Sequence, residues 1–182
     1  MRTAILVSSA MLAFQAHAEE LFALNAGAEW FYEMEGGEAP EAVVRIDETR
    51  SVHGVVWYRL DEFGDVFWVR NGDGGQIEAV EAGDNGPDEK RFYEEVLVFR
   101  YPAEPGERWE LFDTEFTYQG LRPVDVPAGR FDCHAYHLDM GDGRYALSCF
   151  VPKIGLVYSE SVLDDGEKTV ARLVRFDISP EQ

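Results

Sequence analysis

Basic residues are scarce in this sequence. Its 182 residues include 16 Lys and Arg against 35 Asp and Glu, which gives a formal net charge of −19 at pH 7. A chain with this balance repels other polyanions, so nucleic acids and anionic membrane surfaces are poor candidates for partners. The acidic residues are spread along the whole chain, which is typical of a solvated acidic surface.

Cysteine and histidine are also scarce, with two and four copies. Cys133 and Cys149 do not form a C-x-x-C motif, and His134 and His137 are three positions apart, which places them on opposite faces of a strand. This spacing disfavours a thiol redox site and a closed zinc site, so no metal or other cofactor is predicted. No G-x-S-x-G motif and no EF-hand spacing occurs, so no catalytic residue is predicted from a motif.

Long apolar runs are absent after the first residues. Residues 1–18 combine Arg2, a short apolar run and the small-residue end Ala16-His17-Ala18, which is typical of a secretory signal peptide with cleavage before Glu19. No segment reaches the roughly 20 apolar residues that a membrane-spanning helix needs. We therefore predict an exported protein, periplasmic or secreted, with a single domain over residues 19–182 and no integral membrane segment after cleavage.

Alternating apolar and polar residues dominate the rest of the chain, and clusters of Gly, Asp, Asn and Pro interrupt them at short intervals. The predicted strands are Trp30–Met34, Ala42–Asp47, Val52–Leu60, Asp65–Arg70, Gln76–Val80, Glu95–Tyr101, Arg108–Tyr118, Phe131–Leu138, Arg144–Val151, Gly155–Ser161 and Lys168–Ile178. The predicted fold class is all-β, with a curled antiparallel sheet that forms a half-barrel or barrel, because a flat sheet of this size would expose its apolar face. A two-sheet sandwich is the alternative.

The two cysteines flank a Gly-rich acidic turn and are predicted to form a disulfide, since an exported protein meets an oxidising compartment. If Leu138 faces Arg144, then Cys133 lies directly opposite Cys149, within disulfide reach. A turn at residues 141–143 would instead offset the two cysteines by two positions. We favour the first register because the disulfide would itself select it.

Aromatic residues are abundant, with four Trp, eight Tyr and twelve Phe. The pairs Trp57-Tyr58 and Phe67-Trp68 place adjacent rings on opposite faces of a strand. One ring of each pair then reaches the core, while its neighbour faces a second sheet, a cavity or water. These four residues are the predicted ligand-binding residues, and the alternative is that all four rings fill the core.

Two segments share a Gly three positions before a Trp at the start of a strand. They are "LNAGAEWFY", with Gly27 and Trp30, and "AEPGERWEL", with Gly106 and Trp109. The Gly allows the turn into the strand, and the Trp then closes one end of the core.

The segments "YPAEPGERWE", "VDVPAGRFDC" and "SCFVPKIGLVYSES" follow one another in this order. Their pattern, G-x-x-W, then V-P-A-G-x-F, then P-x-x-G-L-V, resembles that of exported bacterial β-rich proteins and lipoproteins of unassigned function. The resemblance covers residues 101–161 and, in the first half, only "GAEWFY". Its motif residues serve turns and packing: Pro127, Gly129, Phe131 and Gly155. It implies a curled antiparallel sheet in the cell envelope and no catalytic residues, although the anchoring cysteine of the lipoproteins is missing here.

These observations favour a non-enzymatic exported module that binds an apolar or aromatic-stacking ligand, with a small molecule or an envelope protein as its partner. One alternative is a small exported hydrolase that uses carboxylates, either Asp139 with Asp142 or Glu94 with Glu95, as acid and base. Another is a purely structural or interaction module. A carrier needs a dry concave face, whereas an enzyme needs convergent polar groups in one cleft.

Overall fold

The computed structural model of the chain describes residues 20–37, 39–80, 86–88, 93–163 and 166–178. The predicted signal peptide therefore lies outside the described residues. Within the described part, twelve strands and no helix are present, and so no helix is long and apolar enough to cross a membrane. The strands are β1 (Glu29–Glu35), β2 (Glu41–Val52), β3 (Val55–Glu62), β4 (Asp65–Gly72), β5 (Gly75–Val80), β6 (Glu94–Arg100), β7 (Arg108–Leu111), β8 (Thr114–Val126), β9 (Gly129–Gly141), β10 (Arg144–Val151), β11 (Gly155–Val162) and β12 (Lys168–Asp177).

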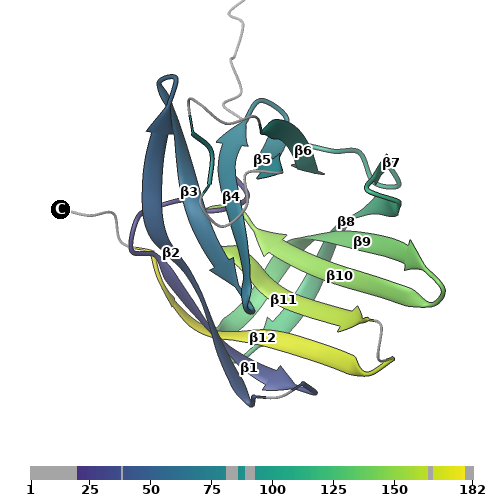
Figure 1. Cartoon of the computed structure of the whole chain (residues 1–182). Helices are drawn as coiled ribbons and strands as arrows, with labels where there is room; N and C mark the ends of the chain where they lie inside the picture. The colour runs from purple at the N-terminus through teal and green to yellow at the C-terminus, as the bar shows by residue number, and fades with distance from the viewer. Residues whose placement is uncertain (1–19, 38, 81–85, 89–92, 164–165, 179–182) are drawn as a thin grey trace, which may run out of the picture.

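All twelve strands belong to one antiparallel sheet in the order β6-β5-β4-β3-β2-β1-β12-β11-β10-β9-β8-β7. Only the pairing of β1 with β12 joins strands that are distant in the sequence. The sheet curls into a nearly closed barrel, with β2 to β4 on one side and β8 to β10 on the other (Figure 1). The prediction of a curled all-β sheet is confirmed, in its barrel-like form.

The two edge strands, β6 and β7, approach each other through side chains. The indole Nε1 of Trp109 on β7 donates a hydrogen bond to the backbone oxygen of Val98 on β6, at 3.1 Å. The guanidinium of Arg100 lies over the Trp109 ring and also pairs with Glu107. These contacts partly protect two edges that would otherwise offer free backbone groups to another chain.

The main core lies inside the barrel and is rich in aromatic rings. Tyr136 contacts Phe99, Trp109, Tyr118 and Phe150, mostly edge to face. This geometry suits the ring quadrupoles and adds to the gain from burying apolar area.

The segment before β1 also enters the main core, although its residues form no strand. Leu21, Phe22 and Leu24 are buried there. The Phe22 ring packs edge to face against Trp30 and Phe150. The sequence pattern gave no strand here, and the part this segment takes in the core was not predicted.

The motif residues of the two G-x-x-W segments lie in comparable positions. Gly27 and Gly106 have φ angles of 78° and 88°, and Trp30 and Trp109 are buried. Trp30 Nε1 donates a hydrogen bond to the backbone oxygen of Ile154 at 2.6 Å. Each Trp therefore ties the start of its strand to another strand or turn, Trp30 to the residue before β11 and Trp109 to β6.

The hairpin of β8 and β9 carries the remaining motif residues at its tip. Pro127 and Ala128 form the turn, Gly129, with a φ of 141°, begins β9, and Phe131 packs against the main core. The backbone nitrogen of Ala128 donates a hydrogen bond to the oxygen of Leu173 at 2.9 Å, so the tip reaches β12. Gly155, with a φ of 108°, begins β11, and a Cβ at this position would lie 2.9 Å from the Phe22 ring.

Two turns differ from the prediction. The segment Asp47–Arg50 is not a turn but lies within β2, and the chain reverses later, at His53 and Gly54. The predicted strand Arg108–Tyr118 is in fact a hairpin, because Phe112 and Asp113 both adopt positive φ between β7 and β8. Neither Phe112 nor His53 belongs to the residue types that normally mark such turns, and the sequence pattern therefore missed them.

The disulfide between Cys133 and Cys149 is present, with a Cα–Cα distance of 5.3 Å, but the favoured register is wrong. Cys149 pairs with Ala135, and Leu138 pairs with Ala146, so the cysteines are offset by two positions. The reason lies at the turn: Asp142 and Gly143 adopt positive φ, 55° and 81°, in a two-residue turn that pairs Gly141 with Arg144, and a bulge at Met140 then shifts the pairing to Asp139 with Tyr145. The disulfide accommodates this register instead of selecting it.

Candidate ligand-binding site

Two adjoining hollows lie inside the barrel. The first, of about 220 Å³, is lined from β3, β4, β5 and β6 on one side and from β9 and β10 on the other. The second, of about 300 Å³, is lined from β1, β3, β4, β11 and β12 and from the adjoining turns. Glu62 and Phe67 line both hollows, so they mark the place where the two meet.

The walls of the first hollow are mainly apolar. Leu60, Val69, Phe99, Leu138 and Phe150 contribute to them. Their arrangement follows from strand alternation, because Leu60 pairs with Phe67 across β3 and β4, and both face inward. Apolar walls of this kind attract hydrocarbon groups, since water in the hollow gains little from contact with them.

Four polar side chains interrupt these walls, those of Glu62, Gln76, Glu78 and Ser148. Glu62 ends β3, and Gln76 and Glu78 lie two positions apart on β5, so that both face inward. Within the described part of the chain, no side chain or backbone group donates a hydrogen bond to the carboxylate of Glu62 or of Glu78. The two acids thus enter an apolar space without a compensating cation.

Burial changes the acidity of both carboxyl groups. The loss of solvent around Glu62, together with the negative charges of Asp65 and Glu78, raises its pKa to about 7. Burial likewise raises the pKa of Glu78. A group whose pKa lies near neutrality exchanges its proton readily, and a cation placed beside it would draw the pKa down again.

Gln76 is the most deeply buried polar residue of the site, with an exposed fraction of 4%. Its carboxamide Oε1 finds no hydrogen-bond partner among the described residues. Leaving such an atom unsatisfied costs about 1–3 kcal/mol. A ligand that donates a hydrogen bond in the first hollow would remove this cost.

Neither a protein-family model nor a curated protein sequence matches this chain. Two solved structures are similar to it in fold. A protein from Bacteroides fragilis, described as exported and with a YmcC-like fold, has 16% identity and a TM-score of 0.49, over 88% of this chain and 99% of its own. A protein from Parabacteroides distasonis, described as a lipoprotein, has 10% identity and a TM-score of 0.38 over the same shares. Similarities this low carry no argument about the function of this chain.

The four predicted ligand-binding residues do not come together. Phe67 lines both hollows, and Tyr58 packs against the main core. Trp57 and Trp68 are buried in a separate cluster with Val52 and Ala79, on the outer face of the sheet. Two faces of the same strands thus bury aromatic rings, and only the inner one borders the hollows.

The outer cluster is covered by neighbouring parts of the chain. Tyr93 packs edge to face on Trp57, and Arg50 lies over the ring of Trp68 and donates a hydrogen bond to the backbone oxygen of Pro87. Gly86 also lies close to Trp68, since a Cβ there would be 2.2 Å from the ring. These contacts fill the space around both indoles, which makes this cluster a second core and not a pocket.

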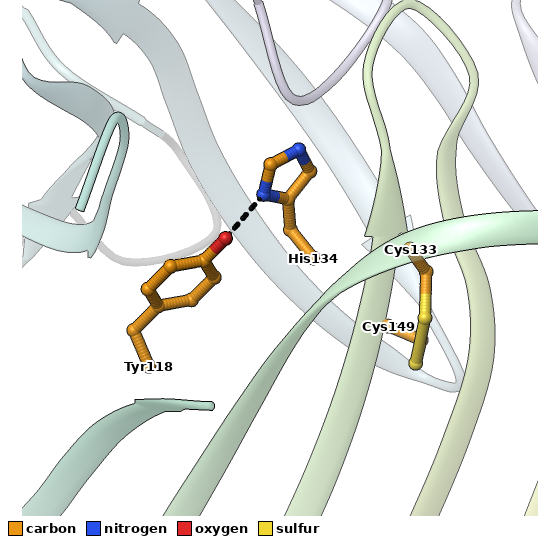
Figure 2. The surroundings of a disulfide bond; sticks show 4 residues. All are labelled: Tyr118, Cys133, His134 and Cys149. Atoms are coloured by element: carbon orange, nitrogen blue, oxygen red, sulfur yellow. Dashed lines mark hydrogen bonds between the residues drawn. A yellow bond between two sulfur atoms is a disulfide. The ribbon is translucent and has the colours of Figure 1, made fainter. Parts of the chain in front are cut away.

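The disulfide takes no part in the lining of either hollow, although its hairpin does. Ser148 and Phe150 line the first hollow, so Cys149 between them points to the opposite face of β10. Figure 2 shows the His134 ring turned toward Tyr118 and away from the disulfide, with 2.7 Å between His134 Nδ1 and the Tyr118 hydroxyl. His137 stacks on Tyr145 instead. In keeping with this separation, the described residues contain no group of three potential metal ligands.

The carboxylates of the alternative hydrolase lie outside the two hollows. Asp139 accepts a hydrogen bond from the backbone nitrogen of Gly141 at 2.9 Å, within the hairpin turn that Asp142 helps to form. Glu94 and Glu95 are exposed at the start of β6, and Glu95 pairs with Arg70. These groups are explained by turn geometry and surface pairing.

Proposed function

We propose that this chain is an exported binding module whose barrel interior holds an apolar small molecule. The observation that carries the proposal is the pair of adjoining hollows inside the barrel, with mainly apolar walls. Protein interiors are normally packed to the density of organic crystals, so two adjoining hollows between the strands of one barrel need an explanation. A bound ligand supplies one.

Export is part of the proposal and rests on residues 1–18, whose composition is typical of a signal peptide. The predicted mature chain then begins at Glu19. The main core supports this boundary, because residues 21–24, close after it, are buried. Intact mass of the protein recovered from the periplasm or the medium checks it, and a mass that includes residues 1–18 would contradict export by this route.

The experiment that tests ligand binding uses a neutral apolar probe. We expect 1-octanol to bind to the purified protein with one site in calorimetric titration and to raise its melting temperature. Two variants fill the hollows from opposite walls: Ser148→Leu in the first and Ser159→Leu in the second. Each should weaken the binding of octanol while the protein stays folded by near-ultraviolet circular dichroism. An unchanged affinity in both variants, or no binding to the native protein, would overturn the proposal.

A further inference from the structure

The polar groups that line the two hollows share one chemical property. The first contains the carboxylates of Glu62 and Glu78, the Gln76 amide and the Ser148 hydroxyl, and the second adds Asp65. No Lys, Arg or His is found among the described residues that line either space. An anionic headgroup, such as a carboxylate or a phosphate, would therefore be repelled, and a cationic one would be attracted.

Among the described residues, the carboxylates inside the barrel lack the hydrogen-bond donors and cations that surround Glu160 on its outer face. Glu160 lies on the outer face of β11, because its neighbours Ser159 and Ser161 line the second hollow. Its carboxylate accepts hydrogen bonds from Tyr145 and Tyr158, at 2.7 and 2.8 Å, and pairs with Lys168 at 2.9 Å. The structure thus neutralises an acid on its outside and leaves two half-buried acids at the mainly apolar wall of the first hollow without a partner from the described residues.

The buried amide of Gln76 also favours a ligand group that donates hydrogen bonds, for a reason that does not depend on charge. Its Oε1 is an acceptor that is buried without a donor among the described residues, and Gln76 contributes to the lining of the first hollow. Buried polar atoms are almost always satisfied in native proteins, so this one marks the place of a missing donor. An ammonium group carries three donors and a positive charge, and it would satisfy the amide oxygen and the carboxylates together.

We propose that the ligand is a primary amine with a hydrocarbon chain, whose ammonium group binds to Glu62, Glu78 and Gln76 while its chain lies along the apolar walls. This inference rests on the proposed binding function and specifies the ligand class. The hydrocarbon has two spaces to occupy, since the first hollow adjoins the second at Phe67, and Met34, Leu163 and Ala171 contribute apolar surface to the second. The headgroup of an amine is positively charged, whereas that of a fatty acid is negatively charged and that of an alcohol is neutral, so the three classes can be told apart by their affinities.

The test compares three probes of the same chain length, octylamine, octanol and octanoate, by calorimetric titration at about pH 7.5 and about 0.15 M NaCl. We expect octylamine to bind at least about tenfold more tightly than octanol, and octanoate to bind most weakly. In the double variant Glu62→Gln/Glu78→Gln, the affinity for octylamine should fall by about tenfold or more, to the level of octanol, while that for octanol stays within about twofold.

A matched control is needed because the whole surface attracts cations. The variant Glu41→Gln/Glu110→Gln removes the same two charges from exposed positions, and we expect it to bind octylamine like the native protein. Equal affinities for octylamine and octanol in the native protein, or equal losses in both double variants, would overturn the amine assignment and leave the binding function intact. Binding of none of the three probes would overturn the binding function itself. Urea unfolding of each variant verifies that it is folded.

Discussion

Glu62 and Glu160 show how strongly surroundings decide the behaviour of one residue type. Burial alone would raise the pKa of Glu160, but hydrogen bonds from Lys168, Tyr145 and Tyr158 outweigh it and lower the pKa to about 2. Glu62 lacks such donors, and burial beside Asp65 and Glu78 raises its pKa to about 7. The native state therefore binds the proton of Glu62 more tightly than the unfolded chain does. When Glu62 loses this proton, the native state becomes less stable relative to the unfolded chain.

We predict that Glu62→Gln stabilises the protein above neutral pH and not in acid. Since the folded pKa of about 7 exceeds the ordinary value of 4.5, the native state holds more protons between these values, and its stability falls as the pH rises through this window. The variant has no such loss, so its free energy of unfolding should exceed that of the native protein by about 3 kcal/mol at about pH 8. Urea unfolding at a series of pH values measures this difference.

Glu110→Gln provides the control, because Glu110 is exposed on β7, and its effect on the free energy of unfolding should not vary through the same window. The charges that raise the pKa of Glu62 come from two strands, Asp65 on β4 and Glu78 on β5. Glu62 in turn, together with burial, raises the pKa of Tyr32 on β1. Parallel pH profiles for the native protein and Glu62→Gln would contradict the assignment.

The hairpin of β9 and β10 is governed by its turn. We predict that Gly143→Ala destabilises the protein by about 1–2 kcal/mol, because residue 143 adopts a φ of 81° that disfavours a side chain, while no other atom lies within 4 Å of the added methyl group. The cost is then one of backbone conformation alone. Urea unfolding of the oxidised protein measures it.

Asp142→Asn serves as the comparison for this hairpin, since Asn tolerates positive φ, and it should change the free energy of unfolding by less than about 0.5 kcal/mol. If Gly143→Ala were as stable as the native protein, the two-residue turn and the register that follows from it would be wrong.

Strand positions were largely predictable from sequence, whereas turns and registers were only partly so. Alternation predicted β1, β4, β5 and β10 to β12 within a few residues, because each buries one face. It failed at Asp47–Arg50, where four polar residues in succession suggested a turn. In the structure Asp47 and Glu48 pair with arginines, Arg59 and Arg50, on an extended strand, so charge pairing replaced the apolar signal that the prediction relied on.

At the scale of the whole molecule, closure of the barrel depends on the contact between its edges. We predict that Trp109→Phe destabilises the protein by about 1–2 kcal/mol, because it removes the hydrogen bond to the Val98 oxygen and weakens the contact with Arg100. Amide hydrogen exchange should accelerate in β6 and β7 and remain unchanged in β1 and β12, where the sheet is continuous. A uniform acceleration over all strands would indicate a general loss of stability instead of opened edges.

The candidate site could not be predicted from sequence, because it depends on which face of the sheet becomes concave. In β3, Trp57 and Tyr58 are equally suited to a core, and alternation does not tell which one faces the barrel interior. The curl of the sheet places Tyr58 and Glu62 inside and Trp57 in the outer cluster. The inward positions of Gln76 and Glu78 could not be predicted from sequence either, because polar residues on a strand normally face water.

The acidic surface supplies a last prediction, which concerns salt. The formal net charge is −19, and folding brings these negative charges closer together, so salt that screens their repulsion stabilises the folded state. Salt also weakens exposed ion pairs such as Arg45 with Asp61 and Arg108 with Glu115, but each of these contributes only about 0–1 kcal/mol to stability. We therefore expect the free energy of unfolding to rise between about 0.02 and about 0.5 M NaCl, as the Debye length falls below about 10 Å. Urea unfolding in both salts measures it, and sucrose of equal osmolality controls for effects unrelated to charge. A fall in stability with NaCl would mean that the surface ion pairs outweigh the net repulsion.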